Sequence, residues 1–80
     1  MDNWESQMLA KVQWVKEQRV RLGLSTTWLV NTLKHKGCDC TTHKIQDVLS
    51  GNIRGGQLDV EIVLYCAQIV LKTYAEWLDT

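Results

Sequence analysis

The side chains best suited to metal or redox chemistry lie close together in the chain, between positions 35 and 43. Four of them carry the nitrogen and sulfur atoms that zinc prefers: His35, Cys38, Cys40 and His43. Their spacing, H-x2-C-x-C-x2-H, differs from the C-x2-C hooks of structural zinc sites, and a metal held there would bend a turn on which two helices depend. Zinc stays an alternative, but we expect no metal and no cofactor.

The cysteines also raise the question of redox chemistry. A disulfide between Cys38 and Cys40 would close a small strained ring, and a reducing cytoplasm disfavours it. Cys66 lies in an apolar segment and is best interpreted as a small core residue. A redox switch would require Cys38 to be exposed with its thiolate favoured. Because the chain has no glycine-rich phosphate loop, nucleophile elbow or recognisable pair of carboxylates, we expect a binding protein and not an enzyme.

A second group of functional side chains lies on a short helix that the sequence predicts over residues 41–50. Thr41 can cap its first turn, and Gly51 can end it because glycine adopts a left-handed conformation without strain. Ile45, Val48 and Leu49 recur at the spacing of one buried stripe. The opposite face carries side chains that donate or accept hydrogen bonds: Thr42, His43, Gln46, Asp47 and Ser50. Such a face suits the edges of bases.

The element that must position this helix is a second helix, predicted over residues 25–36. Ser25 is its N-cap, and Leu24 and Leu29 are spaced to form a hydrophobic staple. Gly37 ends it, and only residues 37–40 separate it from the helix that follows. A connection this short makes the two helices pack at a steep angle, so that the first presents the second outward as in a helix-turn-helix.

These two segments together resemble the lambda-repressor-like family, which includes Cro and Xre-type regulators. The resemblance covers about residues 22–54 and rests on the segment from Leu24 to Val30 and on five later positions that match the family's pattern: Cys40, Thr41, Ile45, Val48 and Gly51. The segment joining the helices is longer than usual in the family, and Leu49 stands where glutamate is common. The resemblance implies a transcription regulator, typically a small repressor from a phage, plasmid or other mobile element.

A regulator of this kind would read DNA with the helix at 41–50 in the major groove. We expect base contacts from Thr42, His43, Lys44, Gln46 and Asp47. Gln46 suits adenine, Lys44 suits guanine or a phosphate, and Asp47 can accept from cytosine. We expect phosphate contacts from Ser25, Thr26, Thr27, Lys34, Lys36, Asn52 and Arg54.

Longer helices are predicted on either side, over residues 3–22 and 58–78. Asp2 or Asn3 can cap the first. The last is apolar on almost every side, and three short helices can cover only part of it. We expect the remaining side to make a homodimer contact that includes Tyr65, Ile69, Tyr74 and Trp77; the alternative is a helix buried entirely in a larger bundle. The predicted fold class is all-α: one domain over residues 1–80, a small bundle of four helices, or five, with a C-terminal apolar dimerisation helix.

The net charge of zero conceals a gradient along the chain. Residues 16–54 hold seven lysines and arginines against three acids, whereas residues 57–80 hold one lysine against four acids. The basic part coincides with the candidate site, although solvated helix faces explain such charges equally well. With neither a membrane-spanning run nor a secretory leader, we expect a cytoplasmic protein whose partner is double-stranded DNA. The competing interpretation is a helical protein-binding module, such as a phage-encoded inhibitor or an antitoxin, because four tryptophans suit a protein interface.

Overall fold

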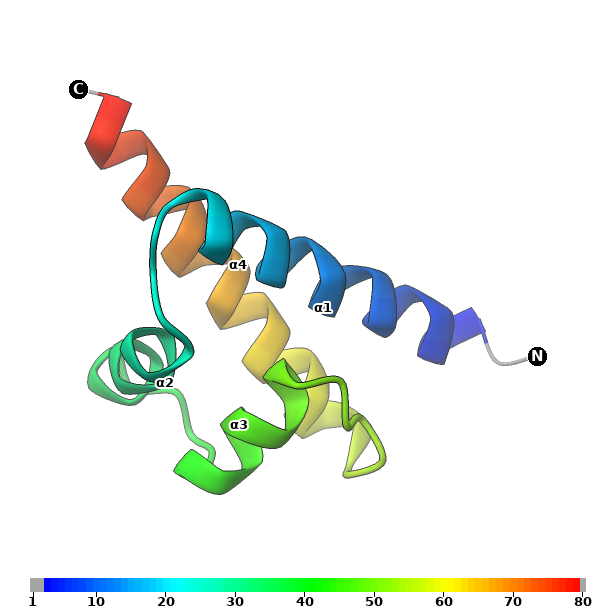
Figure 1. Ribbon diagram of the computed structural model, residues 1–80. Helices are drawn as coiled ribbons and strands as arrows, with labels where there is room; N and C mark the ends of the chain where they lie inside the picture. Colours follow the sequence, from blue (N-terminus) through cyan, green and yellow to red (C-terminus); the bar gives the residue numbers. More distant parts are fainter. Residues whose placement is uncertain (1–2, 80) are drawn as a thin grey trace.

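The computed structural model describes residues 3–79, which form four helices and no strand (Figure 1). The helices are α1 (Asn3–Arg21), α2 (Thr26–His35), α3 (Thr42–Leu49) and α4 (Gln57–Asp79). The predicted all-α class is confirmed, and every observed helix end lies within one residue of the predicted one. No fifth helix occurs in residues 3–79. Asp2, one of two residues predicted to cap the first helix, lies outside the described residues.

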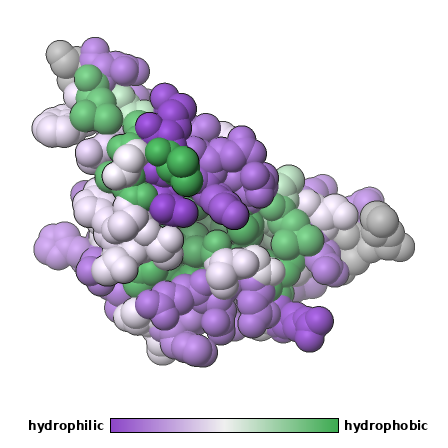
Figure 2. Space-filling view, viewed as in Figure 1, coloured by the Kyte–Doolittle hydropathy of each residue, from purple (hydrophilic) through white to green (hydrophobic). Residues whose placement is uncertain are grey.

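The molecule is elongated, with extents of 41 × 24 × 16 Å. The two long helices, α1 and α4, pack against each other, while α2 and α3 lie below them in Figure 1. The last turns of α4 extend beyond the other three helices. In the same view, polar side chains cover α3 along the lower edge, and a band of apolar side chains separates them from α1 (Figure 2). Among residues 3–79, no helix is sufficiently long and apolar to cross a membrane.

Two hydroxyl side chains begin the central helices. The Oγ of Ser25 accepts a hydrogen bond from the backbone N–H of Trp28 at 3.0 Å, and the Oγ1 of Thr41 accepts from the N–H of Lys44 at 3.1 Å. Both caps have extended backbone angles, so the chain turns sharply into each helix. Both predicted N-caps are therefore confirmed.

The helix ends are closed by a shared backbone motif. After α3, the N–H of Gly51 donates to the carbonyl of Val48 at 3.0 Å and the N–H of Asn52 donates to that of Asp47 at 2.9 Å. This pair of bonds requires a left-handed residue, and Gly51 has φ +99°. Helices α1 and α2 end with the same pair of bonds, at Gly23 and Gly37. The direction in which α3 leaves its preceding turn is thus set locally at both ends.

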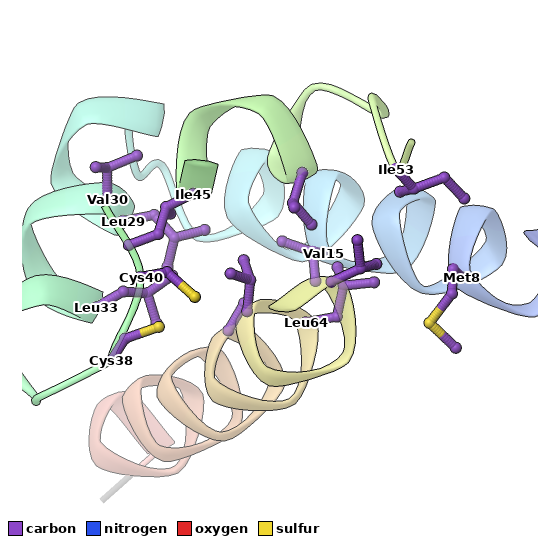
Figure 3. Packing of buried hydrophobic residues seen from close by; sticks show 14 of the residues in the cluster. Met8, Val15, Leu29, Val30, Leu33, Cys38, Cys40, Ile45, Ile53 and Leu64 are labelled. Carbon is purple, nitrogen blue, oxygen red and sulfur yellow. The ribbon is translucent and has the colours of Figure 1, made fainter. Parts of the chain in front are cut away.

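The hydrophobic core is organised around α4, which packs against each of the other helices. Its inner side is fully buried at Val60, Val63, Leu64, Ala67 and Leu71. Figure 3 shows Val15 of α1 and Leu64 of α4 facing one another, with Leu29, Leu33 and Ile45 from α2 and α3 gathered beside them. The outer side of α4 is exposed at Leu58, Tyr65 and Ile69. The alternative of a fully buried last helix is therefore wrong.

Candidate nucleic-acid interface

The face of α3 that points into solvent carries uncharged polar groups and one imidazole. Thr42, His43, Gln46 and Ser50 are exposed. Ile45 and Val48, on the opposite side, have no exposed surface. The core therefore holds the helix from behind and leaves its polar side free to meet a partner. This confirms the prediction that the polar side of the segment faces outward.

One pair of side chains on this face is connected. The Nε2 of His43 lies 3.4 Å from the Oδ2 of Asp47, one helical turn along α3. The His43 side chain is 86% exposed and the Asp47 side chain 37% exposed. The contact turns the carboxylate of Asp47 along the helix toward the imidazole. Gln46 lies between them in sequence, and the hydrogen bonds that the structure shows within residues 3–79 include none to its side chain.

Lys44 is placed differently from the other predicted base contacts. Its ammonium group lies against the backbone of Gly55 in the loop after α3, and a Cβ at Gly55 would overlap it. Lys44 is only partly exposed. Since its charge sits at the edge of the α3 face, beside the loop at residues 51–56, its position favours the phosphate alternative over a contact with guanine.

Two of the predicted phosphate contacts have structural tasks. The Nζ of Lys34 donates to the backbone carbonyl of Cys40 at 2.8 Å, which ties α2 to the residue before the α3 cap. The hydroxyl oxygen of Ser25 accepts the capping bond, which leaves its O–H able to donate. Thr26 and Thr27 are exposed in the first turn of α2, and Lys36 is exposed at its C-cap.

The remaining predicted phosphate contacts lie in the loop that follows α3. Asn52 and Arg54 are both exposed there. The Oδ1 of Asn52 accepts a hydrogen bond from the backbone N–H of Arg54 at 3.4 Å. Ile53, between them, is buried and anchors the loop to the core. Arg54 is thus held at the end of α3 by its neighbours in the chain, with its guanidinium pointing out of the core.

A groove that the sequence did not indicate brings α1 to the same side of the molecule. It has a volume of about 520 Å³ and lies between α1, the start of α2 and the end of α3. Lys16 and Arg19 line it together with Thr26, Ser50 and Gly51. The Nη1 of Arg19 also donates to the carbonyl of Leu24 at 2.8 Å. The signal in the sequence was the spacing of Lys16 and Arg19, which places both cations on one helical face.

A second groove, of about 460 Å³, separates α2 from the C-terminal half of α4. Three of the four predicted dimer residues line it: Ile69, Tyr74 and Trp77. The ring of Tyr74 meets that of Trp28 edge-on, with centroids 5.4 Å apart, and lies 6.0 Å from that of Trp77. Tyr74 therefore faces α2 and is partly buried, whereas Tyr65 lies outside the groove and is 65% exposed.

The three cysteines are free thiols whose side chains converge between the α2–α3 turn and α4. Figure 3 shows the sulfur atoms of Cys38 and Cys40 close to one another. Burial, and then the neighbouring thiols of Cys66 and Cys40, raise the pKa of Cys38 to about 12. Burial also raises the pKa of Cys40. An exposed Cys38 with a favoured thiolate, the condition for a redox switch, is thus not met. No group of side chains in residues 3–79 is arranged to hold a metal ion.

In comparisons with known proteins, no family model, curated protein or solved structure matches the chain. The resemblance of residues 22–54 to lambda-repressor-like regulators stays a prediction. What the fold itself contributes is the exposed polar face of α3, with cations at its edges on α1, on α2 and in the loop after α3.

Proposed function

We propose that α2 and α3 form a helix-turn-helix and that this protein binds double-stranded DNA with sequence preference, as a homodimer that regulates transcription. The observation that carries the proposal is the outward face of α3, where four exposed side chains are held away from the core by two that have no exposed surface. Such a face fits the major groove, which is wide enough to admit an α-helix and presents donors and acceptors on every base pair.

Sequence preference would come from three neighbouring side chains on that face. The amide of Gln46 can donate to and accept from adenine. The carboxylate of Asp47 can accept from the exocyclic amine of cytosine, and its contact with His43 keeps it along the helix. His43 and Thr42 lie toward the amino end of α3, where a recognition helix meets bases first.

Affinity would come from cations around α3. Lys16 lies in the groove beside the end of α3, Lys36 at the end of α2, and Lys44 and Arg54 at the loop after α3. Each phosphate that a cation neutralises releases counterions, so the affinity should fall steeply as salt rises. The zero net charge does not oppose this, because the acids of residues 57–80 all belong to α4.

The experiment that tests the proposal is selection of bound sites from random duplex DNA at near-physiological salt. We expect an inverted repeat whose half-sites are about 34 Å apart, one helical turn. Gln46→Ala should lose the preference at one position of each half-site. Gln7→Ala, which removes an exposed glutamine of α1 far along the chain from α3, is the matched control. If no duplex is bound in a salt-dependent way, the proposal is wrong.

A second candidate, a helical protein-binding module such as an inhibitor or antitoxin, is supported by the apolar groove between α2 and α4. Trp77, which lines that groove, is 69% exposed. Exposed tryptophan is a common anchor of protein interfaces. The same variants distinguish the two candidates. If the partner is a protein bound at this groove, neither Gln46→Ala nor removal of the Lys16 charge should change the affinity.

A further inference from the structure

The outer side of α4 carries a stripe of side chains that, apart from the half-buried Ile62, does not pack against the core. Two sets of residues recur every seven positions along it: Leu58, Tyr65 and Lys72, and Ile62, Ile69 and Glu76. Together they form one stripe on the side of α4 opposite the buried residues Val60, Val63, Leu64, Ala67 and Leu71. All six are exposed except Ile62, which is half-buried. The first four, Leu58, Ile62, Tyr65 and Ile69, are apolar at the alternating spacing of four and three residues by which a helix pairs with another helix, and Lys72 and Glu76 continue the stripe with charges.

Two charged residues lie along one edge of this stripe, on the side of α1. The Nε1 of Trp4 donates to Glu61 at 2.8 Å, and the ammonium of Lys72 lies 5.8 Å from the ring of Trp14. Glu61 and Lys72 are eleven residues apart, which is about three turns or 16 Å along the helix. The two opposite charges therefore share one edge but stand too far apart to pair within the same helix.

We propose that a second copy of this chain covers the stripe, with the two α4 helices antiparallel about a two-fold axis at about the level of Ala67. The inference rests on the homodimer of the proposed function and names its surface and its register. In this register each Lys72 meets Glu61 of the other copy, because a two-fold axis brings the same edges of the two helices together. Tyr65 packs beside Ile69 of the other copy, and Leu58 approaches the groove that holds Trp77.

Charge complementarity selects both the occupant and its direction. In a parallel pair a two-fold axis would instead bring opposite edges together, so Glu61 and Lys72 would each lie across from the edge that carries Cys66 and Thr73 and would meet no opposite charge. An apolar ligand on the stripe would leave the charges of Lys72 and Glu76 in an apolar contact. Because a carboxylate has two oxygens and an ammonium three donors, Glu61 and Lys72 can each keep their contact with α1 and still pair across the axis.

The first test is a charge exchange, read out as the dimer dissociation constant by sedimentation equilibrium without DNA. Lys72→Glu and Glu61→Lys should each weaken the dimer about tenfold, since each replaces two attractive pairs by two repulsive ones. The double variant should recover most of the loss. Lys11→Glu, which makes the same change at an exposed position of α1, should have no effect. Far-UV circular dichroism shows that each variant is folded.

The second test fixes the direction of the helices. In a Cys66→Ser background, whose other two thiols are buried, Glu61→Cys and Lys72→Cys are prepared separately. A short bismaleimide should join the two proteins when they are mixed, and should join neither one to itself. Efficient self-joining of either variant would indicate parallel helices and overturn the inference, as would a monomeric wild-type protein at high concentration or a double variant that does not recover. A monomeric Lys72→Glu that still binds a DNA half-site would support both this inference and DNA binding by α3, whereas DNA binding by a monomeric wild-type protein would overturn this inference alone.

Discussion

The outward faces of α3 and α4 are both exposed, but the face of α3 is polar and that of α4 is largely apolar. Thr42, His43 and Gln46 on α3 stay hydrated at no cost until a partner replaces their water. The outer side of α4 exposes Leu58, Tyr65 and Ile69, whose apolar surface is unfavourable in water. The comparison teaches that exposure alone does not assign a function. A polar face selects its partner by hydrogen bonds, whereas an apolar face needs cover for the sake of the protein's own stability and solubility.

The largest effect is expected where the support of the α3 face is removed. Ile45→Ala deletes buried atoms at a position with no exposed surface, so we expect the free energy of unfolding to fall by about 2–5 kcal/mol. Gln46→Ala, one position further on, should change it by less than about 0.5 kcal/mol because its side chain is exposed. Urea unfolding of both variants is the measurement. Equal losses would mean that the two sides of α3 do not differ as described.

The next effect concerns the apolar face. Ile69→Asp puts a charge in the middle of the stripe on α4, and we expect the dimer to weaken about a hundredfold while the fold is kept. Sedimentation equilibrium measures the first and circular dichroism the second. Ser6→Asp adds the same charge at an exposed position of α1 and should leave association unchanged. If Ile69→Asp leaves the dimer constant unchanged, the apolar face of α4 does not bind a second copy, and the proposed difference between the two faces is wrong.

A smaller effect is expected at the polar face itself. Gln46→Ala should reduce the discrimination between the preferred and the substituted base pair by about 1–3 kcal/mol, because one bidentate contact is lost. Competition binding with duplexes that differ at one position measures it. The dimer constant should not change, since Gln46 and Ile69 belong to different faces. A uniform loss of affinity for all sequences would instead assign Gln46 to the DNA backbone.

The smallest effect is expected from the groove beside α1. Lys16→Ala should weaken all sequences alike and reduce the slope of log affinity against log salt by about one. Lys11→Ala, on the same helix but outside that groove, is the matched control. Titrations of a preferred and a random duplex over a range of salt give both slopes. An unchanged slope would exclude the groove from the DNA-binding surface.

Much of the candidate site follows from short-range rules. The hydroxyls of Ser25 and Thr41 cap helices because they can reach an N–H three residues ahead, and Gly51 ends α3 because it tolerates a left-handed backbone. The outward direction of His43 and Gln46 follows from the spacing of Ile45 and Val48 on the other side. Each rule concerns residues within one or two helical turns, so a single sequence carries it.

Other features depend on residues that are distant in the chain. The α4 sequence is apolar on almost every side, and only packing against three helices decided that Val60 and Ala67 face inward and Tyr65 outward. Packing likewise brought Lys16 to the end of α3 and turned Tyr74 toward Trp28. Local patterns determine where a helix begins and ends and which residues form its buried apolar side, because hydrogen bonds and side-chain spacing act over a few residues. Which of two apolar sides is covered depends on how all the helices fill space together, and no local spacing contains that information.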